Sequence, residues 1–147
     1  MHKLVCITED NFLEVSNFFK ANDITLTDSM WNSYVTNLKE KLGSFWVAIK
    51  EDNNIIAILM LERNTFYKPY ANTARLYMVG SLYVEDADSI FFRAFKSIQS
   101  YADKLSIKNI LYGIQFDDDL TPYINFGFLP NHIDIFAGEV VLSYTVY

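Results

Sequence analysis

The chain is poor in cysteine and contains no long apolar run. Its single cysteine, Cys6, cannot form an internal disulfide, and because it lies in an apolar stretch we expect a small buried hydrophobic side chain rather than a nucleophile. The longest apolar run, IIAILML at residues 55–61, falls far short of the ~20 residues that a membrane helix needs. We therefore expect a cytoplasmic protein with no signal peptide and no membrane partner.

Basic residues and histidines are also scarce. Lys and Arg number 12 against 18 Asp and Glu, which gives a net charge of −6, and the basic residues form no cluster. Phosphate contacts need clustered basic side chains, so the sequence argues against nucleic-acid binding, while an acidic protein tolerates a cationic partner or an amine substrate. His2 and His132 are too few and too far apart to indicate a metal site or a catalytic triad, and His132 is expected in a loop.

What the chain does have is a globular composition, with 51% hydrophobic and 16% aromatic residues in 147 positions. This predicts one α/β domain over residues 1–147, without repeats or linkers. The predicted elements are a strand at 2–7, a helix capped by Thr8, a helix from Thr27-Asp28 to Gly43, strands at 45–50, 54–62 and 76–84, a helix up to Leu105, a strand at 107–114, a short helix between Thr121-Pro122 and Gly127, and strands at 133–136 and 140–146.

The stretch from Arg75 to Phe128 organises the rest. A β-branched and aromatic strand, Leu76 to Val84, contains Gly80, and a glycine inside a strand often marks a bulge or a close backbone approach. The following helix has the apolar spacing of one buried face, and Asp88 is expected as its N-cap. A strand, a crossover helix and a second strand of this length predict a right-handed βαβ unit with parallel strands.

The element order resembles that of the GNAT superfamily of acyl-CoA-dependent N-acyltransferases over nearly the whole chain. The motifs that carry the resemblance are Leu82-Tyr83-Val84 at the end of the strand and YINFGF at 123–128. The resemblance implies a mixed, mostly antiparallel sheet with a central parallel βαβ unit and helices on both faces. It also implies acetyl-CoA as the cofactor and an amine of a small molecule or protein as the acceptor.

The same resemblance assigns roles to residues of this chain. Leu82, Tyr83 and Val84 would lie along the pantetheine arm of the cofactor. The turn after them and the start of the helix, with Asp88, Ser89 and Ile90, would hold the pyrophosphate through free backbone amides. Tyr123 would be the catalytic residue, as the general acid that protonates the departing thiolate.

The turn at Glu85–Ser89 departs from the family pattern. It contains no glycine and no arginine, and it places three carboxylates where a pyrophosphate would rest. Each like-charge contact at ~4–6 Å costs on the order of 1 kcal/mol. The sequence therefore predicts a degenerate pyrophosphate loop and weakened cofactor binding.

A general base is absent from the expected strand position at Val79-Gly80-Ser81. Water, or a carboxylate from another element such as Glu62, would have to deprotonate the amine. The acidic run Asp117-Asp118-Asp119 follows a strand, where it could attract a cationic acceptor or form an ordinary surface turn.

A second function stays open: a non-catalytic scaffold that has lost cofactor binding and binds a protein partner, or a second copy as a homodimer. The candidate contact residues are tyrosines and a phenylalanine, because tyrosine anchors are common in interfaces. They are Phe66, Tyr67, Tyr70, Tyr144 and Tyr147.

Overall fold

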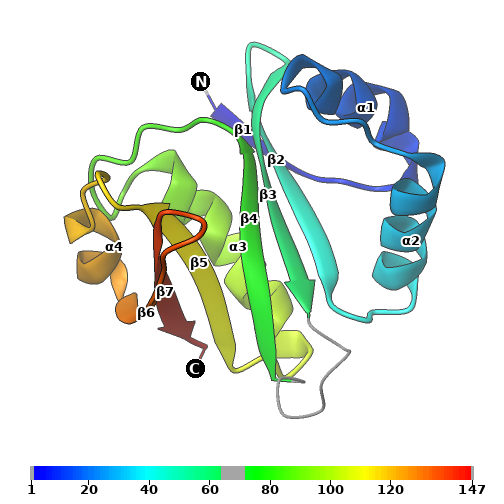
Figure 1. The fold of residues 1–147 in the computed structure, drawn as a ribbon. Coiled ribbons are helices and arrows are strands. Elements are labelled where there is room, and N and C mark those ends of the chain that lie inside the picture. Colours follow the sequence, from blue (N-terminus) through cyan, green and yellow to red (C-terminus); the bar gives the residue numbers. More distant parts are fainter. Residues whose placement is uncertain (1, 64–71, 147) are drawn as a thin grey trace.

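The computed structural model describes residues 2–63 and 72–146, which form one seven-stranded sheet with helices on both faces (Figure 1). The elements in chain order are β1 (His2–Cys6), a 3-10 turn (Glu9–Asn11), α1 (Phe12–Ala21), α2 (Asp28–Lys39), β2 (Ser44–Glu51), β3 (Asn54–Arg63), β4 (Thr73–Gly80), α3 (Ile90–Lys104), β5 (Asn109–Gln115), α4 (Thr121–Phe126), β6 (Leu129–Asp134) and β7 (Glu139–Thr145). None of the helices in these ranges is long and apolar enough to span a membrane.

The strand order across the sheet is β1-β2-β3-β4-β5-β7-β6. Every neighbouring pair is antiparallel except β4 and β5, which run parallel and are joined by α3. Parallel neighbours need a crossover connection, and α3 supplies it. The mixed, mostly antiparallel sheet and its central βαβ unit are therefore confirmed.

Two cores lie on opposite faces of the sheet. Helices α1 and α2 cover one face, and α3 covers the other (Figure 1). β3 contributes side chains to both cores, because successive side chains of a strand point to opposite faces of the sheet. Leu59 and Leu61 pack toward α3, and Ile58 packs toward α1 and α2. Because both faces of β3 are covered, its sequence is nearly all apolar.

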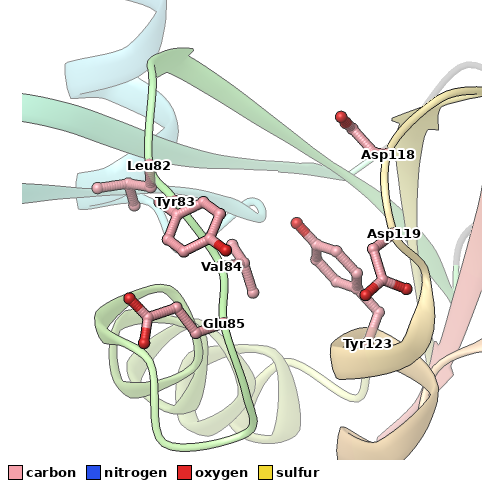
Figure 2. Close-up of a pocket in the computed structure, with 7 residues that line it drawn as sticks. All are labelled: Leu82, Tyr83, Val84, Glu85, Asp118, Asp119 and Tyr123. Atoms are coloured by element: carbon pink, nitrogen blue, oxygen red, sulfur yellow. The ribbon is translucent and has the colours of Figure 1, made fainter.

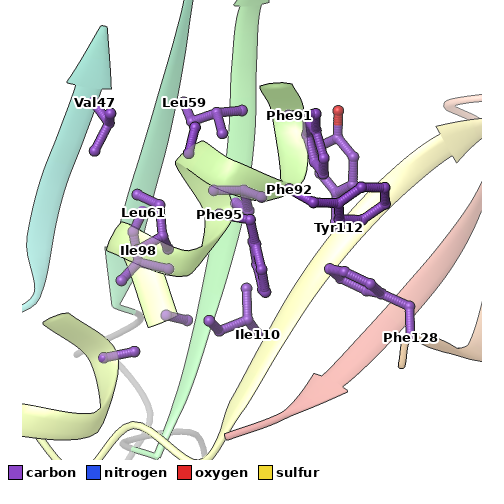
Figure 3. Close-up of a cluster of buried hydrophobic side chains, with 14 of the residues drawn as sticks. Val47, Leu59, Leu61, Phe91, Phe92, Phe95, Ile98, Ile110, Tyr112 and Phe128 are labelled. Atoms are coloured by element: carbon purple, nitrogen blue, oxygen red, sulfur yellow. The ribbon is translucent and has the colours of Figure 1, made fainter. Parts of the chain in front are cut away.

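The α3 core is aromatic. Phe91 and Phe95 are fully buried on the helix face that the apolar spacing predicts, with Phe91 5.3 Å from the ring of Tyr112 and Phe95 5.0 Å from that of Phe128 (Figure 3). The Tyr144 ring joins the same cluster, 5.0 Å from that of Phe95. The Tyr144 side chain packs against this core but is only partly buried, so its role as a partner contact stays a prediction. The other four predicted contact residues, Phe66, Tyr67, Tyr70 and Tyr147, lie outside the described residues.

The central strand ends earlier than the sequence predicts. We expected it to continue to Val84, but β4 ends at Gly80, whose φ is +91°. A Cβ at Gly80 would lie 2.5 Å from the carbonyl oxygen of Ile56, so the predicted close backbone approach is confirmed. Residues 81–84 leave the sheet as an extended segment because the backbone turns at this glycine.

Several local predictions at helix ends need correction. The N-cap of α3 is Ser89 rather than Asp88, and that of α4 is Leu120 rather than Thr121. The α-helix α1 begins at Phe12, after the 3-10 turn, and so starts later than a cap at Thr8 implies. The cap of α2 is confirmed, since the side chain of Thr27 accepts a hydrogen bond from the Met30 amide at 3.1 Å.

Two further boundaries differ from the prediction. Helix α2 ends at Lys39, before Gly43, because residues 40–43 already turn toward β2. His132 lies in β6, paired with Val141 of β7, and is not a loop residue. The strand extends back to Leu129, and Pro130 is tolerated there because β6 is an edge strand, where a missing N–H breaks no ladder.

The predicted burial of Cys6 is wrong. Cys6 is exposed at the end of β1, which is the edge strand on the other side of the sheet.

Candidate functional site

A groove opens where the two parallel strands separate. β4 and β5 pair only over Thr73–Leu76 and Asn109–Tyr112, so the last residues of each strand have no partner in the other. A cavity of about 500 Å³ lies between these unpaired ends. It sits at the carboxyl ends of parallel strands, which is where sheets of this kind bind ligands, and its size is typical of a small-molecule site.

A second cavity of about 460 Å³ adjoins the groove. The extended segment Leu82–Glu85 forms one wall, and Asp118, Asp119 and Tyr123 form the other (Figure 2). Leu82, Asp118 and Tyr123 line both cavities. Figure 2 shows the Tyr123 hydroxyl pointing into the space between the two walls.

Tyr123 is held rigidly by aromatic packing. Its ring meets the edges of Phe91 and Phe92 at 5.6 and 5.5 Å, and the residue is only 7% exposed. Burial, with a smaller contribution from the negative charge of Asp118, raises the pKa of Tyr123 to about 12. The phenol therefore keeps its proton at neutral pH, which suits a proton donor and not a base.

The structure brings together only part of the predicted site. Leu82, Tyr83 and Val84 line one cavity with Tyr123. The remaining predicted residues, Asp88, Ser89 and Ile90, lie at the start of α3 and line neither cavity.

Backbone amides of the turn before α3 form hydrogen bonds to side chains of the same turn. The Oγ of Ser89 accepts hydrogen bonds from the amides of Glu85 and Asp86, both at 3.0 Å. The Oδ1 of Asp86 accepts from the amide of Asp88 at 2.9 Å. Three amides that could face a phosphate are thus bound within the turn, and the carboxylates of Glu85, Asp86 and Asp88 are exposed around them. Around these occupied amides the turn presents negative charge, which opposes a diphosphate.

The acidic run after β5 divides between two roles. Asp118 faces both cavities, whereas Asp119 accepts a hydrogen bond from the Thr121 amide at 2.9 Å, which lowers the pKa of its carboxyl group. The run is therefore a helix-entry turn that places Asp118 at both cavities and Asp119 at the second cavity alone.

An ion pair at the other end of the groove has no signal in the sequence. The Arg75 guanidinium lies 3.5 Å from Oε1 of Glu139, and it also lies over the ring of Tyr77 at 5.8 Å. Gly113 makes room for the acid, because a Cβ there would lie 2.6 Å from the Glu139 carboxylate. The pair joins β4 to β7 across β5, so only the folded sheet brings its members together.

Glu62, a candidate base, does not line the cavities at Tyr123. It is on β3, and it lines a separate cavity against α2 rather than either cavity at Tyr123. At the strand position where the sequence offers no base, Gly80 and Ser81 line the groove.

Comparison with solved structures gives whole-chain matches. An acetyltransferase of the GNAT family from Streptococcus pneumoniae matches with a TM-score of 0.74 and 10% identity, over 100% of both chains. The ribosomal-protein-S5-alanine acetyltransferase of Vibrio fischeri matches with a TM-score of 0.72 and 14% identity, over 99% of this chain and 93% of its own. The chain has the GNAT fold.

A third GNAT-fold match was solved with coenzyme A. It is the PaiA N-acetyltransferase of Thermoplasma acidophilum, with a TM-score of 0.62 and 10% identity, and the alignment covers 99% of each chain. No protein-family profile and no curated protein sequence matches this chain. Identities this low establish a shared fold, so function has to be argued from the site itself.

Proposed function

We propose that the groove between β4 and β5 transfers an acetyl group to an amine, with Tyr123 as the proton donor. The observation that carries this is the position of the Tyr123 hydroxyl, which points between the walls of the two adjoining cavities from a setting that keeps it protonated. The GNAT fold supports it, because the solved structures that share the fold are acetyltransferases. An acetyl thioester such as acetyl-CoA would supply the acetyl group.

Each residue of the groove has a separate role in the proposed reaction. The amine nitrogen bonds to the carbonyl carbon, and Tyr123 donates its hydroxyl proton to the sulfur as the carbon–sulfur bond breaks and the thiol leaves. Water then returns a proton to the Tyr123 oxygen. Asp118 places a negative charge at the same opening, which attracts a cationic amine. The amine loses its own proton to water, because neither Gly80 nor Ser81 can act as a base there. Leu82 and Val84 offer apolar contact to the thioester arm.

The acetyl donor is expected to bind mainly through its arm. The groove fits a pantetheine thioester in size and polarity, whereas the Glu85–Ser89 turn opposes a diphosphate with three carboxylates and three occupied amides. Asp88, Ser89 and Ile90 then add little to donor binding. The diphosphate and nucleotide of acetyl-CoA should contribute almost no affinity.

Calorimetry with two donors tests both parts of this proposal. Acetyl-CoA and acetyl-pantetheine, which lacks the diphosphate and nucleotide, should bind with affinities within about threefold of each other, a difference below 1 kcal/mol. Each should also yield N-acetylated product with a primary amine, detected by mass spectrometry. A tenfold preference for acetyl-CoA would show that the turn binds the diphosphate after all. Failure of both donors to bind would overturn acetyl transfer.

The occupied amides of the turn also favour a second candidate, a non-catalytic scaffold that binds a protein partner or forms a homodimer. In that case neither donor binds, and sedimentation velocity should show self-association or a stable complex. A monomer that turns over an acetyl donor would exclude this candidate.

A further inference from the structure

A third cavity, of about 370 Å³, lies on the α2 face of the sheet. Side chains of α2, β2, β3 and β4 form its walls, and among the described residues that line it Glu62 alone has a formal charge. Five wall residues are aromatic or carry a thioether, and three are polar: Met30, Tyr34, Trp46, Met60 and Tyr77, with Ser33, Asn37 and Ser44. The cavity thus combines one carboxylate with soft, polarisable walls.

Glu62 is fixed in position by two neutral donors. The indole Nε1 of Trp46 donates to its Oε1 at 2.7 Å, and the Oγ of Ser44 donates to its Oε2 at 2.5 Å. Trp46 and Ser44 are themselves buried, at 5% and 3% exposure. A carboxylate has about four lone-pair sites, so acceptor capacity on both oxygens remains unused.

No cation of the described chain compensates this carboxylate. Arg75 is opposite Glu62 in the β3–β4 register, but its guanidinium is directed to Glu139 and to the Tyr77 ring. None of the ion pairs in residues 2–63 and 72–146 includes Glu62. Burial raises the pKa of the Glu62 carboxyl group, and hydrogen bonds from Ser44 and Trp46 offset this only in part. Glu62 is partly buried, and a carboxylate removed from water without a counter-charge loses hydration free energy that a bound cation would offset.

We propose that this cavity binds a small organic ammonium ion, with Glu62 as its counter-charge and the ring of Tyr77 against its alkyl groups. The ring of Tyr77, which is 47% exposed, can attract an alkylated ammonium group, and the thioethers of Met30 and Met60 adapt to its shape. Tyr34 and Trp46 stack on each other at 4.1 Å and form the buried wall behind. A metal ion is a poorer fit, because the cavity offers one carboxylate and hard cations prefer six or more oxygen ligands. This cavity shares Tyr77 with the groove between β4 and β5, but Tyr123 does not line it, so the proposal does not depend on acetyl transfer.

Choline and 3,3-dimethylbutan-1-ol make a matched pair of probes, since the alcohol has the same shape without the charge. The chain has two tryptophans, so a Trp31→Phe variant assigns the indole N–H signal of Trp46 in a nitrogen–proton correlation spectrum. Choline should shift the Trp46 signal in a saturable way, because that N–H is bonded to Glu62. The neutral alcohol should bind at least tenfold more weakly.

Glu62→Gln removes the charge and keeps the carbonyl that accepts from Trp46, so the fold should survive. Choline binding should weaken at least tenfold in this variant, while binding of the alcohol should be unchanged. Glu40→Gln is the control, because it removes one negative charge from the protein as Glu62→Gln does. Glu40 is exposed at the end of α2 and lies outside the cavity. Equal choline affinity in wild type and Glu62→Gln, or no saturable shift in wild type at millimolar choline, would overturn the proposal.

Discussion

Gly80 touches the neighbouring strand so closely that a Cβ on it would lie 2.5 Å from the carbonyl oxygen of Ile56. At the same residue the backbone adopts a φ of +91° and β4 ends. The chain beyond it forms one wall of the second cavity. This close approach therefore coincides with the point where the central strand leaves the sheet and becomes a wall of the second cavity.

Gly80→Ala should destabilise the protein by about 2–4 kcal/mol, because it adds a backbone clash to a left-handed conformation that L side chains rarely adopt. Urea unfolding measures the change. Gly138→Ala is the control: Gly138 also has a positive φ, +68°, but a Cβ there would meet only the Gln115 side chain, at 4.0 Å. It should cost only about 1 kcal/mol. Equal losses in the two variants would show that the contact with Ile56 is unimportant.

The same glycine shows how far the sequence predicts this fold. The apolar periodicities of α3 and of the strands were sufficient to predict the element order and the parallel βαβ unit. They could not predict the end of β4, because the apolar and aromatic character continues through Leu82 and Val84. Only the contact between Gly80 and Ile56 reveals the break.

The family resemblance assigned Leu82–Val84 and Tyr123 to one site, and their roles in catalysis and cofactor binding stay predictions. Tyr123 and the Leu82–Val84 segment do line one cavity. The Arg75–Glu139 pair and the Glu62 cavity depend on residues from different strands, and their spacing in sequence carries no signal. At α3, Ser89 replaces Asp88 as the cap, since either residue type suits that position and the fold of the turn decides.

Tyr34→Phe should destabilise the fold by about 1–3 kcal/mol, because it leaves two buried backbone groups without a partner. The Tyr34 hydroxyl donates to the carbonyl oxygen of Ile7 at 2.7 Å and accepts from the Trp46 amide at 3.2 Å, linking α2 to β1 and β2. Tyr144→Phe, whose hydroxyl makes no hydrogen bond within the described residues, should cost less than about 0.5 kcal/mol. Similar midpoints of urea unfolding in wild type and Tyr34→Phe would contradict this account.

Stability should fall at alkaline pH. Burial raises the pKa of Tyr34 and Tyr112 well above the ordinary value, and it raises the pKa of Tyr123 to about 12. A phenol with a raised pKa in the folded state stabilises the protein fully below the unfolded value near 10, and this contribution is lost as the pH rises through the folded value. Urea midpoints should therefore drop from pH 10 upward. The drop should be shallower in Tyr34→Phe, and a slope that this variant leaves unchanged would refute the assignment.

Tyr123→Phe should lower the rate of acetyl transfer by roughly 100-fold or more, because it removes the proposed proton donor. The change in stability should stay below about 1 kcal/mol, since the hydroxyl makes no hydrogen bond within the described residues and the ring keeps its contacts with Phe91 and Phe92. Because the pKa of Tyr123 is about 12, the wild-type rate should show no loss from its ionisation between pH 7 and about 10. Tyr144→Phe is the control, as that residue lines neither cavity. If Tyr123→Phe keeps more than half of the wild-type rate, Tyr123 is a packing residue and the proton must come from water.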